Sequence, residues 1–320
     1  MIQPNVGKAK RGSAMKIVIV GAGAMGTLFG GRLARAGHQV VFVDTDNARI
    51  GAIAQQGVFE NGVAALCEAA LPGTLEGVAD LLILFTKSLH TALAMKANAA
   101  ALKPDGLVLT LQNGLGNGEA IAEVVGASRV LVGITNWPAD LLDHGRIHVD
   151  GAGIVKLWSL TGEDSPALHT VSDALSDAGL SATAEPSVQQ AIWEKVIFNA
   201  ALNGIAALTG MAVGQIGDFG PVRELAMRIV TEGVVVAEAA GVTVEPDKVG
   251  ASVEFAMEHH RGHKPSMLQD VEAGRPTEVD AIQGGLLKAA IQWGVAAPAL
   301  ETCAALLRGL DHRAAITRKC

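Results

Sequence analysis

The sequence has little cysteine and no excess of positive charge, and both shortages exclude classes of function. Only Cys67, Cys303 and Cys320 occur among the 320 residues, and they form neither a CxxC pair nor an even-numbered disulfide framework. Such usage is typical of a protein in the reducing cytoplasm. Lysine and arginine number 25 against 32 aspartates and glutamates, giving a formal net charge of −7. Because nucleic-acid phosphates are bound by concentrated Lys and Arg, we expect no nucleic-acid partner.

Two segments bear on export and membrane association. Residues 1–14 are polar and basic and lack the apolar core of a secretory signal, so we expect a disordered leader and a folded part that begins at Met15. Residues 196–217 carry no charge and nearly reach the length that spans a bilayer. They include Asn199 and Asn203, whose amides would be costly against lipid. We therefore expect a buried helix between domains, no membrane association and a cytoplasmic location.

The first half of the chain alternates strand and helix patterns. Residues 16–20 form a β-branched run without alternation, typical of a parallel strand covered on both faces. Further apolar runs at 81–85 and 107–111 are separated by a helical pattern at 88–102. Strands that interleave with helices indicate a doubly wound sheet. Residues 138–160 are glycine-rich and predict antiparallel hairpins at an edge of that sheet.

The pattern changes after Pro186. From Val188 onward only helical patterns occur, broken by Gly-Pro at 220–221 and by other glycine and proline residues. The predicted fold is therefore α/β, with an N-terminal Rossmann-type doubly wound domain over residues 15–186 and an all-α domain over residues 187–320.

A glycine-rich motif lies directly between the first strand and the first helix. It comprises Gly21, Ala22, Gly23, Ala24, Met25 and Gly26. A GxGxxG motif alone is a weak signal, but in this context it indicates a dinucleotide site. Gly21 permits the tight turn, Gly23 lets the backbone approach a pyrophosphate, and Gly26 allows close packing of helix on strand. The helix N-terminus at Ala24 and Met25 provides N–H groups for the phosphates. A glycine-rich turn without a ligand is the alternative.

The end of the second strand bears on which nicotinamide cofactor binds. Asp44 follows Gly26 by 18 residues, where a carboxylate can accept both adenosine ribose hydroxyls and repel a 2′-phosphate. The pattern favours NADH over NADPH. Two alternatives stay open: Asp44 could cap a turn with Thr45 and Asp46, or Arg49 could turn toward a phosphate.

Three polar residues share one face of the apolar helix. Lys195, Asn199 and Asn203 lie at i, i+4 and i+8. A lysine at the edge of an apolar segment is partly desolvated, which favours its neutral form and makes it a usable proton donor near neutral pH. The structural alternative is a lysine that extends to solvent beside two amides satisfied by the backbone.

Four further segments together resemble the ketopantoate reductase (2-dehydropantoate 2-reductase) family. They are WEKVIFNAALNGIAAL at 193–208, KPSMLQDVEAGRPTEVDAIQGG at 264–285, FTK at 85–87 and QNGLGN at 112–117. The resemblance covers nearly the whole chain from Met15, in order and at plausible spacings. It implies a Rossmann domain followed by a helical domain and a small 2-oxo acid as substrate.

The resemblance also implies a role for each matching residue. Lys195 would be the general acid, and Asn199 and Asn203 would line the substrate site. Asn113 would contact substrate and nicotinamide. Lys87 would lie in the cleft and help to hold cofactor and substrate.

Two matches fall in the C-terminal motif. Ser266 would hold the substrate carboxylate, with the alternative that it caps a helix near Asp270. Glu278 would engage the substrate hydroxyl or the nicotinamide ribose and orient the lysine, with the alternative of a solvated helix residue. Three histidines between residues 259 and 263 lack a carboxylate or cysteine pattern around them, so we expect a polar helix end and no metal site.

Two departures from the family pattern qualify these expectations. Asp44-Thr45-Asp46 stands where the family commonly has a basic residue for the NADPH phosphate, and Gln283-Gly284 stands where it often has Asn-Gly. The sequence predicts reduction of 2-dehydropantoate to (R)-pantoate with NAD(P)H, in pantothenate biosynthesis. The alternatives are an NAD-dependent D-2-hydroxyacid dehydrogenase acting on branched or aromatic 2-oxo acids, and a non-catalytic dinucleotide sensor. A homodimer is one possible assembly.

Overall fold

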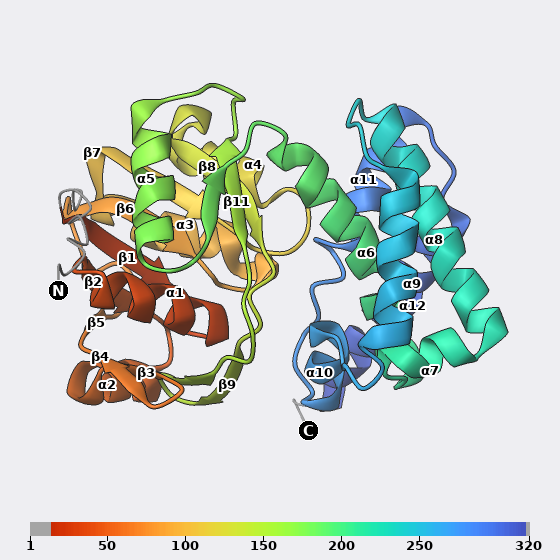
Figure 1. The fold of residues 1–320 in the computed structure, drawn as a ribbon, viewed down its shortest axis with the longest axis horizontal. Coiled ribbons are helices and arrows are strands. Elements are labelled where there is room, and N and C mark those ends of the chain that lie inside the picture. Colours follow the sequence, from red (N-terminus) through yellow and green to blue (C-terminus); the bar gives the residue numbers. More distant parts are fainter. Residues whose placement is uncertain (1–13, 318–320) are drawn as a thin grey trace, which may run out of the picture.

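Residues 14–317 are described by a computed structural model, so the predicted leader, apart from Ala14, lies outside the described residues. The first half is built on an eight-stranded sheet in the order β12-β11-β8-β7-β6-β1-β2-β5 (Figure 1). Its strands are β1 (Lys16–Val20), β2 (Gln39–Val43), β5 (Glu68–Ala70), β6 (Ala79–Leu84), β7 (Leu102–Thr110), β8 (Val130–Thr135), β11 (Val155–Ser159) and β12 (Ala182–Ala184). Only the β8–β11 pair is antiparallel among these strands.

The strand order reverses at β1, which lies between β2 and β6. In doubly wound sheets, ligands bind outside the carboxyl ends of the strands at such a switch point. The helices of this half are α1 (Ala24–Arg35), α2 (Asn47–Gln56), α3 (Thr91–Asn98), α4 (Asn117–Val125) and α5 (Pro166–Asp177). The predicted doubly wound fold is thereby confirmed. The sheet core is apolar on both faces, since Ile17, Val18 and Ile19 of β1 are all fully buried.

The segment at 138–160 differs in part from its prediction. A second sheet, ordered β4-β3-β10-β9, contains β3 (Val58–Glu60), β4 (Val63–Ala65), β9 (Asp140–Asp143) and β10 (Arg146–His148). The β9–β10 hairpin therefore pairs with β3 of this separate sheet, while only β11 extends the main sheet. A hairpin pattern specifies local pairing but not the strand that its free edge joins.

The predicted helix at 88–102 is shorter and is flanked by 3-10 turns. These are η1 (Ser88–His90) before α3 and η2 (Ala99–Ala101) after it; a third, η3 (Ala127–Arg129), follows α4. The first turn tightens where the backbone N–H of Ser88 is bonded outside its own helix, to Glu278. The start of this helical segment is thus bonded to the helical half of the chain.

The second half contains helices alone among residues 188–317. They are α6 (Val188–Thr209), α7 (Val213–Asp218), α8 (Gly220–Ala239), α9 (Pro246–His259), α10 (Ser266–Glu272), α11 (Gln283–Trp293) and α12 (Pro298–Thr317). The long helix α6 leads from the sheet half into the helical half (Figure 1), and it packs against α8, α10 and β8. The part of the predicted buried helix from residue 196 to 209 lies in α6 and is largely buried, as predicted. The prediction was wrong beyond Thr209, because Gly210 adopts the left-handed conformation (φ +74°) and ends the helix, and α7 begins separately at Val213. Within the described residues, no helix has the length and apolar character needed to cross a membrane.

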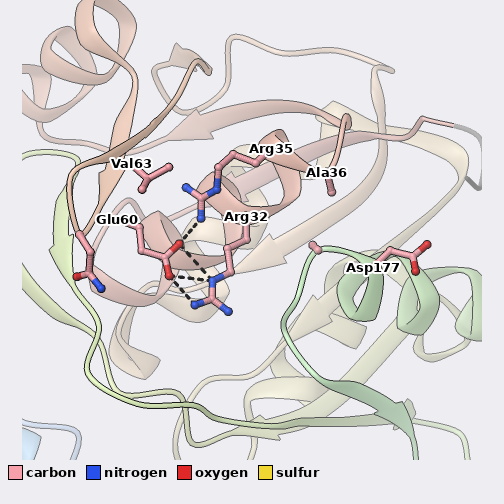
Figure 2. A pocket seen from close by; sticks show the side chains of 8 residues that line it. Arg32, Arg35, Ala36, Glu60, Val63 and Asp177 are labelled. Atoms are coloured by element: carbon pink, nitrogen blue, oxygen red, sulfur yellow. Dashed lines mark hydrogen bonds and ion pairs between the residues drawn. The ribbon is translucent and has the colours of Figure 1, made fainter. Parts of the chain in front are cut away.

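A hollow of about 470 Å³ lies on the sheet half between α1, β3 and the end of α5. Inside it, the guanidinium groups of Arg32 and Arg35 converge on the Glu60 carboxylate (Figure 2). Arg32 also donates to the Gly179 carbonyl oxygen at 2.7 Å and stacks over Trp137. These contacts connect α1 to β3 and to the loop after α5, and the Glu60 carboxylate offsets one of the two arginine charges.

Candidate active site

The glycine loop between β1 and α1 has the geometry that its sequence predicts. Gly21 has φ +100°, and a Cβ there would lie 2.7 Å from the Thr86 backbone nitrogen. A Cβ on Gly26 would lie 1.9 Å from the carbonyl oxygen of Gly21. Gly23 instead faces open space, with no atom within 4 Å of a Cβ placed on it. The turn is therefore tightly packed at its first and third glycines and open at the second.

The first turn of α1 presents unused hydrogen-bond donors beside that open space. Gly23 is the N-cap and contributes no side-chain cap. The N–H groups of Ala24 and Met25 have no acceptor within residues 14–317. Unpartnered N–H groups at the positive end of a helix dipole attract anions. These residues therefore fit the pyrophosphate of a dinucleotide cofactor.

Asp44 lies at the end of β2, beside the glycine loop. Its Oδ2 accepts from the backbone N–H of Ala22 at 2.8 Å and from Arg49 Nη1 at 3.1 Å. Its Oδ1 accepts from the backbone N–H of Asp46 at 3.0 Å. The cap of α2 is Asp46, which accepts from Ala48 and Arg49. Arg49 is thus engaged by two carboxylates, and its buried Nε has no partner among the described residues.

Lys195 of α6 reaches across to the sheet half. Its Nζ donates to the carbonyl oxygen of Thr135, at the end of β8, over 2.6 Å. Burial lowers the pKa of the Lys195 ammonium from 10.5 to about 8, and the Glu278 carboxylate opposes that shift. An amine with this pKa holds a proton at neutral pH and releases it readily, which suits a general acid.

Asn199 and Asn203, on the same helix face as Lys195, are largely buried residues whose side-chain amides have no hydrogen-bond partner among the described residues. Asn199 is 8% exposed and Asn203 is 6% exposed. No described residue makes a hydrogen bond to either side-chain amide, and neither amide is among the fully buried atoms left without a partner, so both keep access to open space. The alternative of backbone-satisfied amides therefore does not describe this helix. Such groups are available to a polar ligand.

Lys87 and Asp270 join the two halves beside this helix. Lys87 follows β6, and its ammonium pairs with the buried Asp270 carboxylate of α10. It also lies 3.4 Å from the carbonyl oxygen of Pro276. Arg275 donates to the other Asp270 oxygen at 2.9 Å. The ammonium of Lys87 is therefore engaged by a carboxylate that the sequence pattern did not predict as its partner.

Glu278 is held by Ser88, a residue that no sequence motif singled out. Its Oε1 accepts from both the backbone N–H of Ser88 at 3.0 Å and the Ser88 hydroxyl at 2.9 Å. Asn113, in the turn after β7, lies against the same serine, since its carbonyl oxygen accepts from Ser88 Oγ at 2.8 Å. The adjacency of Ser88 to Lys87 was the one signal that could have pointed to it.

Ser266 is the first residue of α10 and is exposed. The N-cap of α10 is Pro265, with no side-chain cap, so the structure does not support the capping alternative. No hydrogen bond from a described residue engages its hydroxyl. Nearby, the His259 ring stacks on Phe255. Across residues 14–317, no three His, Cys, Asp or Glu side chains are grouped so as to hold a metal ion.

A small cavity lies between the glycine-rich turn after β7 and the start of α6. Its volume is about 100 Å³, and Gln112, Gly114, Asn117 and Trp193 are among its lining residues. It places open space next to Asn113 and one turn or less before Lys195 on α6. None of the residues predicted for the site lines this cavity. The contacts that do join the predicted segments are those of Lys87 and Ser88 with Asp270 and Glu278, and that of Lys195 with Thr135.

Both halves of the chain match models of one protein family. The family described as "Ketopantoate reductase PanE/ApbA" matches residues 17–162, and its C-terminal counterpart matches residues 187–311. A 2-dehydropantoate 2-reductase of Halobacterium salinarum is 33% identical over 300 residues, covering 92% of this chain and 98% of that protein. One of Streptococcus pyogenes is 31% identical over 288 residues, covering 89% and 94%.

Solved structures agree with these sequence relatives. A D-mandelate dehydrogenase in a ternary structure with NADH and anilino(oxo)acetate has a TM-score of 0.89 at 29% identity, over 94% of this chain and 99% of that chain. A 2-dehydropantoate 2-reductase of Geobacter metallireducens has a TM-score of 0.85 at 30% identity, over 92% and 99%. This chain belongs to the ketopantoate reductase family.

Proposed function

We propose that the chain is a cytoplasmic 2-oxo acid reductase that converts 2-dehydropantoate to (R)-pantoate with a reduced nicotinamide cofactor, a step of pantothenate biosynthesis. The observation that carries the proposal is the polar face of α6. There, a partly buried lysine of pKa about 8 lies one and two turns from two asparagines whose amides have no hydrogen-bond partner among the described residues. Residues 15–186 would hold the cofactor and residues 187–320 would supply most of the catalytic side chains.

The reaction needs a hydride for the carbonyl carbon and a proton for its oxygen. When bound, the nicotinamide supplies the hydride. The Lys195 ammonium donates its proton to the carbonyl oxygen as negative charge develops there, and the resulting neutral amine is reprotonated from solvent. Asn199 and Asn203 donate hydrogen bonds that orient the oxo acid, while the Ser266 hydroxyl holds its carboxylate.

The remaining predicted residues act at the cofactor end of the cleft. The loop of Gly21, Gly23 and Gly26 and the N–H groups of α1 hold the pyrophosphate. Asn113 contacts substrate and nicotinamide from the turn after β7. Lys87 assists both ligands from the end of β6, and Glu278 engages the substrate hydroxyl or the nicotinamide ribose.

For the cofactor we propose NADH over NADPH. The Asp44 carboxylate is fixed by the Ala22 N–H beside the glycine loop, so it is held where an adenosine ribose would lie. A 2′-phosphate would bring about −1.5 to −2 charges toward it. Arg49 neutralises part of that carboxylate, so we expect a preference of about tenfold. At an effective dielectric constant near 20, unit charges 4 Å apart interact by roughly 4 kcal/mol. A preference of about tenfold between the two cofactors corresponds to about a third of that energy.

The second candidate is a D-2-hydroxyacid dehydrogenase of the same fold that acts on branched or aromatic 2-oxo acids. Two observations favour it: the similarity to a D-mandelate dehydrogenase solved with NADH, and Asp44 in place of a basic residue. One experiment separates the candidates. Steady-state kcat/KM is measured for 2-dehydropantoate, phenylglyoxylate and a straight-chain 2-oxo acid, with NADH and NADPH in turn. The first candidate predicts that 2-dehydropantoate is reduced with the highest kcat/KM, and a higher value for phenylglyoxylate would favour the second.

A further inference from the structure

Within the described residues, the hydrogen bonds of the Glu278 carboxylate to the sheet half all come from Ser88. Ser88 begins η1 just after β6, and its N–H and hydroxyl both donate to Glu278 Oε1, at 3.0 and 2.9 Å. The two residues are 190 positions apart in the sequence. The contact therefore forms only when the helical half is docked against the carboxyl ends of the strands.

The serine hydroxyl is itself held by a chain of polar side chains. Asn117 donates to Ser88 Oγ at 3.4 Å and to the Asn113 carbonyl oxygen at 3.0 Å. The Asn117 side-chain oxygen accepts from Thr91 at 2.9 Å, and Thr91 accepts from Gln112 at 2.9 Å. Thr91 and Asn117 are buried. Since such a network fixes the positions of its members, Ser88 presents a defined pair of donors to the cleft.

Lys87, the residue before Ser88, contacts the same segment of the helical half. Lys87 pairs with Asp270 and approaches the carbonyl oxygen of Pro276, two residues before Glu278. The consecutive pair Lys87-Ser88 thus contacts the segment from Asp270 to Glu278 at both of its ends.

We propose that Ser88 is a positioning residue that fixes the Glu278 carboxylate across the cleft and through it sets the electrostatic environment of Lys195. The proposal rests on the proposed function, and it deepens it by adding a residue that touches neither substrate nor cofactor. The hydroxyl has one hydrogen and two acceptors within reach, Glu278 Oε1 and the Asn113 carbonyl oxygen. Its backbone N–H donates to Glu278 alone and supplies the second bond.

The charged groups around the lysine define what Ser88 can influence. Glu278 is the charged group whose carboxylate acts on the Lys195 ammonium and raises its pKa, against the larger effect of burial. The neighbouring charges of Lys87 and Arg275 are paired with Asp270 on the same segment. If Glu278 turns away, the support for the charged lysine weakens and its pKa falls below about 8.

The test is Ser88→Ala, compared with Ser88→Thr and with Ser172→Ala. Alanine keeps the backbone N–H bond, threonine restores the hydroxyl, and Ser172 is a buried serine of α5 outside the site. We expect kcat to fall about tenfold for Ser88→Ala at pH 8, roughly 1.4 kcal/mol of transition-state stabilisation. The alkaline limb of the kcat profile should move to lower pH, KM should change less than twofold, and threonine should recover most of the loss. The proposal would be overturned if kcat fell in Ser88→Ala while the alkaline limb of the pH profile stayed at the wild-type pH. It would also be overturned if Ser172→Ala lost as much kcat as Ser88→Ala.

A double-mutant cycle with Glu278→Gln asks whether Ser88 acts through the carboxylate. If it does, Ser88→Ala has little further effect in the Glu278→Gln protein, and the two losses are strongly non-additive. Additive losses would contradict a route through Glu278.

A readout without substrate keeps this inference separate from the proposed function. The rate of Lys195 acetylation by acetic anhydride, followed by mass spectrometry across pH, gives the pKa of the amine directly. Wild type should give about 8, and Ser88→Ala a lower value, with Ser172→Ala unchanged. If no 2-oxo acid is reduced, the proposed function fails; if the labelling curve does not move, the role of Ser88 fails.

Discussion

Lys195 Nζ donates to the Thr135 carbonyl oxygen at 2.6 Å, which ties the middle of the apolar helix α6 to the carboxyl end of β8. The bond brings the lysine to the edge of the sheet at which doubly wound folds bind their ligands. It also accounts for the low exposure of a basic group on a helix that is mostly apolar. The same burial that lowers the pKa of Lys195 makes the lysine costly to keep charged.

Lys195→Met should lower kcat for 2-oxo acid reduction by about 10²–10⁴-fold, because general acid catalysis is typically worth that much. Methionine keeps much of the side-chain volume, so the dissociation constant for NADH should change less than about threefold. Steady-state rates and fluorescence titration of NADH measure the two effects. Turnover within a few-fold of wild type across pH 6–9 would remove Lys195 as the acid.

The same variant should be more stable than wild type at neutral pH. The folded-state pKa of Lys195 is about 8, below the ordinary 10.5, so the unfolded chain binds more protons between those values. The lysine therefore destabilises the fold below about pH 8 by roughly 3 kcal/mol, and this cost fades as pH rises toward 10.5. Loss of the Thr135 bond offsets part of the gain. Urea unfolding at pH 7 and pH 10 measures the free energy of unfolding of both proteins. We expect the value for Lys195→Met to exceed that of wild type by about 1–2 kcal/mol at pH 7 and not to exceed it at pH 10. A difference that is the same at both pH values would argue against a depressed pKa of Lys195.

Asn203→Leu should separate function from stability. The amide of Asn203 has no partner among the described residues, so leucine should leave the melting temperature unchanged or higher while it lowers kcat/KM by at least about tenfold. Asn98→Leu is the matched control, because Asn98 is also buried but donates to the Ala94 carbonyl oxygen and accepts from Gly73. The control should lose stability and keep kcat/KM; the reverse pattern would mean that Asn203 is structural.

Ser266→Ala should mainly raise KM for the oxo acid. A hydroxyl that holds the carboxylate equally in the ground and transition states contributes uniform binding, so kcat should change less than about twofold. The exposed position of Ser266 and the absence of a cap at α10 make a stability effect small. Initial rates over a range of oxo acid concentrations measure both constants, and an unchanged KM would exclude Ser266 from the site.

Asp44→Ala combined with Thr45→Arg should narrow or reverse the preference for NADH. The substitutions remove the carboxylate beside the ribose position and supply a cation for a 2′-phosphate. The ratio of kcat/KM for the two cofactors is compared at matched ionic strength, with Thr45→Ala as the control. A clear wild-type preference for NADPH would show that Arg49 serves the phosphate and that Asp44 does not exclude it.

The glycine loop and the polar face of α6 could be predicted from local sequence pattern, because each depends on the spacing of residues within one short segment. The φ of Gly21 and the close packing of Gly26 follow from the motif, and Lys195, Asn199 and Asn203 share a face by helix periodicity. The doubly wound sheet followed from the alternation of apolar strands and helical segments.

Contacts between distant segments could not be derived in this way. The bonds from Ser88 to Glu278 and from Lys195 to Thr135 span 190 and 60 residues, and no local periodicity encodes them. The short strands β3, β4 and β5 and the helix α2 were also not predicted. Three-residue strands carry too few residues for an alternation pattern, and β10 pairs with β3, which lies more than 80 residues earlier in the chain.

The most direct test of the account is a single experiment on wild type and Lys195→Met with 2-dehydropantoate. NADH oxidation is followed by absorbance from pH 6 to pH 10, and the product is identified by chiral chromatography. The account predicts (R)-pantoate from wild type, with a kcat that is level below about pH 8 and falls above it, and a rate at least about 10²-fold lower for the variant. No pantoate from wild type, or an equal rate from the variant, would contradict it.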